Sequence, residues 1–375
     1  MAQQQQKPEE KQSILQRVRE LEEELSTTKY NKSSQHHVGL VKAKIALLKE
    51  KQERRIAGKG KTEGFSVKRS GDATVIIVGY PSVGKSTLLN ALTNAKSEVA
   101  AYAFTTLTCI PGLLDYKHAK IQVLDVPGII SGAASGLGRG KEVLACAQSA
   151  NLVMLIVDVF HPEHLPILHK EVYDSHLRLN KRKPTIKIVK KERGGVDIGS
   201  TVKLTKLDEG TITGIMKEFR LNNASIVIRD DVDADELIDV IEGNKKYVPA
   251  ITVLNKIDLV DARELERVKR IVQPDICISA EQGINIGELK DLLFERLRFI
   301  RVYCKQQGKK ADMDVPLIML KGSTIKEMCE KLHRDMVRKF RFARIWGRSA
   351  KFAGQSIRSL EHKLQDEDVV EVHTT

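Results

Sequence analysis

Hydrophobic residues near the N-terminus follow a helical period. Two apolar stripes, each spaced alternately four and three residues apart, are connected by the stretch 31–39, which is polar apart from Val38. The stripes consist of Ile14, Val18, Leu21 and Leu25, and of Val38, Val41, Ile45 and Leu48. Such stripes are typical of amphipathic helices that pack against each other. With Ser33 or Ser34 as a helix N-cap, the pattern predicts a basic helical hairpin within residues 1–60.

From about residue 65, short and continuous apolar runs alternate with helical patterns. The runs are Val75–Val78, Ile121–Leu124, Leu152–Val157, Ile251–Leu254 and Ile276–Ile278. Continuous apolar strands are typical of a parallel sheet that is covered on both faces by helices. The sequence therefore predicts an α/β domain with a parallel, doubly wound sheet.

One connection in this domain is unusually long. Residues 159–254 lie between Asp158, at the end of one predicted strand, and Asn255, directly after the next, whereas a strand–helix–strand unit needs roughly 30 residues. A structureless loop of this length is uncommon in a compact domain. We therefore predict an inserted small α+β domain at residues 170–245, which divides the α/β domain into residues 65–169 and 246–298. Its predicted elements are strands at Thr185–Val189, Thr201–Leu204, Thr211–Met216 and Ser225–Ile228, and a helix at Asp235–Ile241.

The pattern changes again near residue 299. A predicted strand at Val315–Leu320 precedes Thr324-Ile325-Lys326-Glu327, a capping box that begins a helix. We expect this helix to bury Ile325, Met328, Cys329, Leu332 and Met336. Further strands are predicted at Phe342–Trp346 and Asp368–Val372. This order predicts a ubiquitin-like β-grasp domain at residues 299–375.

The strongest chemical signal is a phosphate-binding loop between the run Val75–Val78 and a predicted helix. It reads Gly79-Tyr80-Pro81-Ser82-Val83-Gly84-Lys85-Ser86-Thr87. At a strand-to-helix turn, such a loop wraps phosphates with backbone N–H groups, and the helix dipole favours their negative charge. Lys85 would reach the β- and γ-phosphate oxygens, and the Ser86 hydroxyl would hold Mg²⁺. A chance glycine-rich turn is the alternative, but three further motifs in the right order exclude it.

Those motifs follow the predicted strands. Asp125 begins a D-x-x-G sequence that ends at Gly128, and it can hold Mg²⁺ through water while the Gly128 N–H contacts the γ-phosphate. In Asn255-Lys256-Ile257-Asp258, the Asp258 carboxylate can accept two hydrogen bonds from guanine, while adenine would leave it unpaired. Asn255 would brace neighbouring loops and the Lys256 stem would lie along the base. In Ser279-Ala280, the Ala280 N–H can meet the guanine O6. The set predicts a GTP site.

The segment between the phosphate loop and Asp125 contains Tyr102-Ala103-Phe104-Thr105-Thr106. A GTPase needs a threonine here that contacts Mg²⁺ when the γ-phosphate is present, and we favour Thr106 over Thr105. An ordinary β-rich segment is the alternative. Catalysis would then rest on Lys85, Thr106 and Gly128. Ile129 occupies the place of a water-orienting glutamine, so we expect slow hydrolysis.

These motifs resemble the Obg-related GTPases, and most of all the developmentally regulated GTP-binding protein (DRG) family. The resemblance covers essentially the whole chain and implies a cytoplasmic GTPase linked to ribosomes, with a C-terminal TGS domain. Some relatives use potassium through an asparagine in the phosphate loop. Ser82 stands at the matching position here, which weakens that device but leaves K⁺ as a candidate cofactor beside Mg²⁺.

Charge and cysteine content complete these expectations. The 375 residues include 62 Lys and Arg against 49 Asp and Glu, a surplus of +13 that favours an RNA or ribosome partner over a mere solubility device. Five scattered cysteines and the absence of a long apolar run predict a cytoplasmic protein without disulfides or membrane contact. A protein partner that acts on the glycine-rich segment 128–140 is also expected. The rival functions are an RNA-binding module whose affinity is set by GTP and a metabolic P-loop kinase, against which the N-K-x-D and Ser-Ala motifs count.

Overall fold

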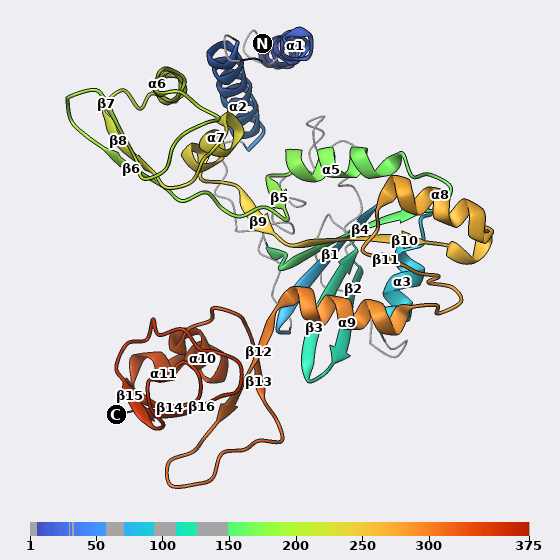
Figure 1. The fold of residues 1–375 in the computed structure, drawn as a ribbon, viewed down its shortest axis with the longest axis vertical. Helices are drawn as coiled ribbons and strands as arrows, with labels where there is room; N and C mark the ends of the chain where they lie inside the picture. Colours follow the sequence, from blue (N-terminus) through green and yellow to red (C-terminus); the bar gives the residue numbers. More distant parts are fainter. Residues whose placement is uncertain are drawn as a thin grey trace. The chain divides into compact units, whose positions relative to one another are not determined.

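The computed structural model describes residues 6–29, 31, 34–57, 71–93, 110–125 and 149–374. Within this part, the chain forms two compact units. The first contains the N-terminal helices and residues 176–247, and the second contains residues 71–93, 110–125, 149–175 and 248–374 (Figure 1). No helix in these described ranges is long and apolar enough to cross a membrane. The predicted division into five domain segments stays a prediction.

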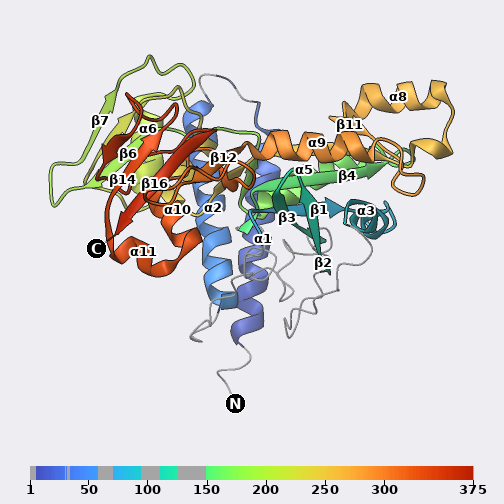
Figure 2. The ribbon, with the colours of Figure 1, turned by 90° about the horizontal axis from the view of Figure 1, so that it is seen from below.

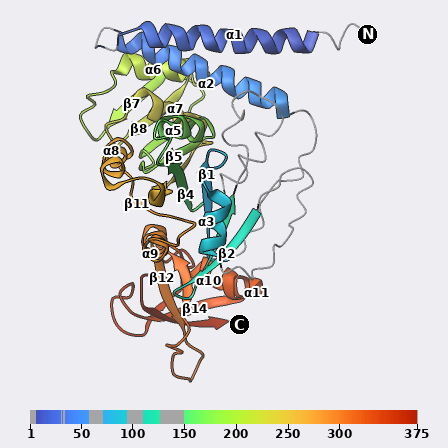
Figure 3. The same cartoon turned by 90° about the vertical axis from the view of Figure 1, so that its right-hand side faces the viewer.

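In the first unit, helices α1 (Gln6–Thr27) and α2 (Gln35–Ala57) lie side by side as a hairpin (Figure 2, Figure 3). The two stripes seen in the sequence form its interface, which buries Ile14, Val18, Leu21, Val41 and Ile45, with Leu25 and Leu48 packed against them. The predicted hairpin is therefore present. Its basic face is partly neutralised, because Lys42 pairs with Asp235 and Lys49 with Glu22.

The inserted segment folds as a three-stranded sheet with helices on one face. Its elements are β6 (Ile186–Lys190), β7 (Val196–Ser200), α6 (Glu209–Glu218), β8 (Ala224–Ile228) and α7 (Ala234–Glu242), with the sheet order β6-β8-β7. The short strands β5 (Leu177–Leu179) and β9 (Lys246–Val248) pair with each other at its two ends. Two strand predictions are wrong. The segment Thr211–Met216 lies in helix α6. No strand forms at Thr201–Leu204, because the strand in this region, β7, ends at Ser200.

Helix α2 packs directly on α6, so the hairpin and the insert share one core. Ala43 of α2 is fully buried among residues of the insert. The helices approach closely because each contributes a glycine at the contact. A Cβ atom on Gly39 would lie 2.7 Å from Thr211 Cγ2, and one on Gly214 would lie 2.9 Å from Leu40 Cδ2. The Lys42 Nζ also donates a hydrogen bond of 2.6 Å to Asp235 at the start of α7.

The second unit contains a six-stranded sheet in the order β11-β10-β4-β1-β3-β2. All neighbouring strands pair in parallel except β2, which is antiparallel to β3 at the sheet edge. Their bounds are β1 (Ala73–Gly79), β2 (Ile110–Tyr116), β3 (Ala119–Asp125), β4 (Leu152–Asp158), β10 (Ala250–Asn255) and β11 (Ile276–Cys277). Every residue of β1 and β4 is buried, as the continuous apolar runs predict. The predicted parallel, doubly wound sheet is confirmed.

Helices cover both faces of this sheet (Figure 1). On one face α3 (Lys85–Leu92) and α9 (Ile286–Leu297) share a core with β1 and β3. On the other, α5 (His164–Asp174) and α8 (Ala262–Val272) pack around Leu254 at the end of β10. A short 3-10 helix, η1 (Ile257–Leu259), follows β10. All strands of the sheet except β2 run in the same direction. Their carboxyl ends lie on one side of the sheet, and the motif residues of the loops collect there.

The C-terminal part of the second unit is a five-stranded sheet in the order β13-β12-β16-β14-β15. Its elements are β12 (Phe299–Cys304), β13 (Leu317–Leu320), α10 (Ile325–Leu332), α11 (Arg334–Arg338), β14 (Phe340–Trp346), β15 (Gln355–Ile357) and β16 (Asp368–Thr374). The capping box at Thr324 and Glu327 begins α10 as predicted. Leu332 is 41% exposed rather than buried, and Met336 belongs to α11, because the helix breaks at His333 in extended backbone.

Four aromatic residues lie among basic residues in the segment 339–352, namely Phe340, Phe342, Trp346 and Phe352. Aromatic residues are usually core residues, which predicts that at least two of these four are buried, but only Phe340 of the four packs against the buried cluster. Phe342 instead stacks on His373 at 4.2 Å, and the Lys305 Nζ lies 4.4 Å from the Trp346 ring centre. Phe352 is 66% exposed. The reason is strand alternation, since Phe342 and Trp346 point away from the face that Ala343 and Ile345 bury.

Candidate functional site

The predicted phosphate loop connects the buried strand β1 to the N-terminus of α3. Gly79 ends β1, and Gly84 is the N-cap of α3 with a positive φ of 93°. A Cβ atom on Gly84 would also lie 2.5 Å from the Asn255 Nδ2, so both its backbone angle and its surroundings require glycine. Pro81, Ser82, Ser86 and Thr87 are exposed around this turn. The N-terminal N–H groups of α3 are thus available to an anion.

Lys85 lies in the first turn of α3 and folds back over the loop. Its Nζ donates hydrogen bonds to the carbonyl oxygens of Gly79 (2.9 Å) and Tyr80 (2.8 Å). Burial lowers the pKa of this amine, and the charge of Asp125 raises it in part. The amine is therefore held inside the loop, where phosphate oxygens can replace or join the carbonyl groups as acceptors.

Asp125 ends β3, beside β1 in the sheet, and it is 6% exposed. Burial raises the pKa of its carboxyl group, and the nearby Lys85 charge counteracts this only in part. Its Oδ1 is buried and accepts no hydrogen bond from the described residues. A buried carboxylate oxygen without a partner calls for a cation or an ordered water. Asp125 therefore fits the Mg²⁺ role predicted for it, while the Mg²⁺ role of Ser86 stays a prediction.

Asn255 joins the phosphate loop to the Ser279-Ala280 segment. Its Nδ2 donates to the carbonyl oxygen of Val83 (2.8 Å), and its Oδ1 accepts from the Ala280 N–H (3.0 Å). Asn255 is 2% exposed and Ser279 is fully buried. The bracing role predicted for Asn255 is confirmed, and it places the phosphate and guanine motifs at one edge of the sheet.

The remaining guanine-motif residues follow β10. Lys256 adopts a left-handed backbone (φ 65°), and its Nζ lies 3.4 Å from the Asp158 Oδ2 at the end of β4. Asp258 sits in η1 with its carboxylate exposed, as a group that is to meet a base must be. Thr106, Gly128 and Ile129 lie outside the described residues, and so does the glycine-rich segment 128–140.

One contact of the phosphate loop was missed by sequence reasoning. The ring of Tyr80 stacks on His164, the first residue of α5, at 3.9 Å, and His164 in turn stacks on His161 at 4.9 Å. The Asp158 Oδ1 fixes the turn before α5 by accepting from the N–H groups of Phe160 and His161. The sequence His161-Pro162-Glu163-His164 directly after a strand was the available signal.

Comparison with known families agrees with this arrangement. Residues 74–191 match a family described as "50S ribosome-binding GTPase", residues 193–299 match its C-terminal region, and residues 300–374 match the TGS domain. Fold, loop geometry and these matches together define a P-loop GTPase that carries a C-terminal TGS domain.

Similar proteins are related over nearly their full length. An uncharacterized GTP-binding protein of Methanocaldococcus jannaschii is 52% identical, covering 96% of this chain and 92% of that protein. Developmentally-regulated G-protein 3 of Arabidopsis thaliana is 44% identical (96% and 98% covered). Developmentally-regulated GTP-binding protein 2 of Homo sapiens is 40% identical (96% and 99% covered). The chain belongs to the developmentally regulated GTP-binding protein family.

Proposed function

We propose that this protein is a Mg²⁺-dependent switch that binds GTP, hydrolyses it slowly and associates with ribosomes or RNA according to the bound nucleotide. The observation that supports this most directly is the pair of hydrogen bonds by which Asn255 joins Val83 to Ala280. A phosphate loop alone is compatible with many nucleotides. A phosphate loop fixed to an N-K-x-D motif and a Ser-Ala segment favours guanine.

The site divides into three groups of residues. Those that would hold the phosphates are Gly79, Tyr80, Pro81, Ser82, Val83, Gly84, Lys85, Ser86 and Thr87. Guanine would be recognised by Asn255, Lys256, Asp258, Ser279 and Ala280. Mg²⁺ would be held by Ser86, by Thr106 and, through water, by Asp125, where it would neutralise charge on the phosphate oxygens.

Hydrolysis would be attack of water on the γ-phosphate, which breaks the bond between the γ-phosphorus and the β–γ bridging oxygen and releases GDP and inorganic phosphate. Lys85 and the Gly128 N–H would stabilise the charge that develops on the phosphate oxygens, and Thr106 would order the segment around it. Ile129 has no polar group that could orient the water, so the basal rate should be low. Potassium, the ribosome or a protein partner that orders residues 128–140 would supply the missing stimulation.

A polyanionic partner is favoured by exposed basic residues in both units. In the insert these are Lys181, Arg182, Lys183, Lys187, Lys190 and Arg193. On the TGS sheet, Phe342 and Trp346 lie beside His373 and Lys305, an arrangement on which unpaired bases can stack. A polyanionic partner of this kind favours a cytoplasmic location. The same location is favoured by the free thiols of the described cysteines Cys277, Cys304 and Cys329, because thiols stay reduced in the cytosol.

Guanine recognition is tested by Asp258→Asn. Two hydrogen bonds to a charged group contribute about 3–6 kcal/mol, so GTP affinity should fall by about 10²–10⁴-fold. Xanthosine nucleotides should bind better to this variant than to the wild type, because their donor and acceptor match the amide. Titration with fluorescent nucleotides measures both effects. Equal binding of ATP and GTP to the wild type would contradict the proposed base recognition.

The switch is tested by sedimentation of the purified chain with ribosomes, with GDP or with a non-hydrolysable GTP analogue. We expect more protein in the ribosomal pellet with the analogue, and loss of that difference in Thr106→Ala. Cosedimentation that is indifferent to nucleotide in the wild type would instead favour an RNA-binding module with incidental hydrolysis.

A further inference from the structure

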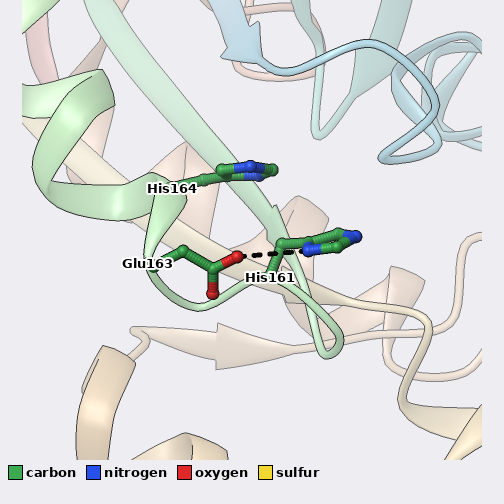
Figure 4. Close-up of side chains that lie close together, drawn as sticks. All are labelled: His161, Glu163 and His164. Carbon is green, nitrogen blue, oxygen red and sulfur yellow. Dashed lines mark hydrogen bonds and ion pairs between the residues drawn. The ribbon is translucent and has the colours of Figure 1, made fainter.

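Beside the phosphate loop, three potential metal ligands gather at the start of α5. They are His161 and Glu163, in the turn after β4, and His164, the first residue of the helix (Figure 4). One ligand atom from each lies within 4.8 Å of those of the others. Among the described residues, this is the one group of three or more such side chains close enough to share an ion.

The geometry points to a bound divalent transition metal, and we propose that His161, Glu163 and His164 form a site for an ion of the Zn²⁺ class. Two imidazoles and one carboxylate are a ligand set that suits zinc, with ligand distances of about 2.0–2.2 Å. Mg²⁺ and Ca²⁺ prefer oxygen ligands, so the predicted Mg²⁺ site at Asp125 and this site would take different ions. A fourth position would be left to water.

A second observation also calls for a ligand. The His164 Nδ1 is buried and has no hydrogen-bond partner in the described part of the chain. Buried ring nitrogens are normally paired, and a missing partner calls for an ion or a water molecule. The other ring contacts of His164 are stacks with Tyr80 and His161, which hold the imidazole in place without satisfying that nitrogen.

The other two ligands can adjust to an ion. His161 and Glu163 are exposed, and the His161 Nδ1 lies 3.2 Å from the Glu163 Oε1. Figure 4 shows the Glu163 carboxylate turned toward the His161 ring, with the His164 ring above. Coordination would need both of these side chains to rotate, because the three ligand atoms lie within 4.8 Å of one another rather than around a common point, and the two imidazole rings are stacked at 27°. The alternative is an ordinary ring stack, with Glu163 merely favoured by the positive end of the α5 dipole.

The cluster is connected to the nucleotide motifs at two points. Tyr80 of the phosphate loop stacks on His164. The Asp158 Oδ1 accepts a hydrogen bond from the His161 N–H, and the Asp158 Oδ2 lies 3.4 Å from the Lys256 Nζ. An ion that fixes His161 and His164 would therefore restrain residues at both ends of the GTP site. We expect its binding to slow the release of GDP. This coupling rests on the proposed GTP site, whereas metal binding itself does not.

Metal binding is tested with the full chain freed of metal and nucleotide. Co²⁺ serves as a visible probe and Zn²⁺ as its competitor. We expect one equivalent of Co²⁺ to give ligand-field absorption that Zn²⁺ removes. Affinity should fall by at least about tenfold in His161→Gln and in Glu163→Gln, since even supporting residues of metal sites contribute that much. His118→Asn, which removes an exposed histidine of the same unit, should leave affinity unchanged.

Asp125→Asn separates this site from the Mg²⁺ site and should also leave Co²⁺ affinity unchanged. Absence of stoichiometric binding, or equal affinity in the wild type, His161→Gln and Glu163→Gln, would overturn the proposal. The coupling is read from GDP release in excess Mg²⁺, with and without Zn²⁺. We expect slower release with Zn²⁺ in the wild type and His118→Asn, but not in Glu163→Gln. No effect of Zn²⁺ on release, despite binding at the cluster, would overturn the coupling alone and leave the metal site standing.

Discussion

At the scale of single residues, the Asp125 carboxylate shows how the site is prepared for a cation. Its Oδ1 is buried and accepts no hydrogen bond from any residue that the structure describes, and the attraction of the carboxylate to Lys85 does not offset the effect of burial on its pKa. Lys85 is likewise partly desolvated beside the carbonyl oxygens of the loop. Bound phosphate would pair with the Lys85 ammonium group, and bound Mg²⁺ would pair with the Asp125 carboxylate. The protein therefore holds these groups at a cost in stability that the bound ligand would remove.

This cost predicts that Asp125→Asn stabilises the nucleotide-free protein at neutral pH. The carboxyl group titrates near pH 3.9 in an unfolded chain and at a higher pKa in the folded protein. The penalty is therefore absent at a pH below the unfolded pKa and develops as pH rises through the folded pKa. Thermal unfolding at a series of pH values should show a gain for Asp125→Asn that vanishes in acid.

Asp115→Asn, at an exposed position on the neighbouring strand β2, is the matched control and should show no such gain. With GDP and Mg²⁺ added, the wild type should gain more stability than Asp125→Asn. A nucleotide-free variant that is less stable than the wild type at neutral pH would contradict this account.

At the scale of elements, α6 shows why local patterns mislead. Its β-branched residues Thr211, Ile212 and Ile215 favour a strand in isolation. Two features override that preference. The Asp208 side chain caps the helix by accepting from the Thr211 N–H at 2.6 Å, and the buried positions recur with helical spacing because α2 and the sheet cover that side. The cap was readable in the sequence, whereas the packing partner, which lies far away along the chain, was not.

The close approach of α2 and α6 predicts that Gly214→Val separates these helices. The added side chain would meet Leu40 and His36, and overpacking of this kind costs about 1–3 kcal/mol. Thermal unfolding of the full chain should shift to lower temperature, while GDP affinity stays unchanged because the nucleotide motifs belong to the other unit. Gly287→Val, at an exposed helical glycine with open space around it, provides the control. Equal stability of Gly214→Val and the wild type would show that the contact contributes little.

At the scale of the whole molecule, the sequence was sufficient for the elements that carry short motifs or continuous apolar runs. The parallel sheet, the capping box at Thr324 and the bracing by Asn255 all follow from local patterns. Contacts between distant segments that carry no recognisable motif could not be predicted in this way. Packing of α2 on the insert and stacking of Tyr80 on His164 depend on the tertiary structure. The spacing of residues along the chain does not show which of these surfaces meet.

The charge surplus predicts a salt-dependent association with RNA. The logarithm of the association constant for a single strand should fall linearly with the logarithm of salt concentration, with a slope of about −0.7 per phosphate contact. We expect replacement by serine of the four basic residues Lys181, Arg182, Lys183 and Lys187 to make this slope less steep by up to about 3, because four phosphate contacts would be lost. Serine at Lys309 and Lys310, exposed in another domain, is the control. Binding of an oligouridylate, measured by fluorescence anisotropy, gives both slopes. An unchanged slope would mean that the basic cluster is an ordinary solvated surface.

The two-sided packing of α2 has a consequence for synthesis of the chain. One side of the helix meets α1, which precedes it, but Ala43 is buried against residues 207–238, about 160 residues further along. At about 5–20 residues per second, a ribosome needs roughly 10–30 seconds to make that stretch. During this interval the nascent hairpin has one side paired and the other still open to water. Cotranslational folding of this unit therefore waits for α6, β8 and α7, and chaperones that recognise exposed apolar surface have that interval in which to bind.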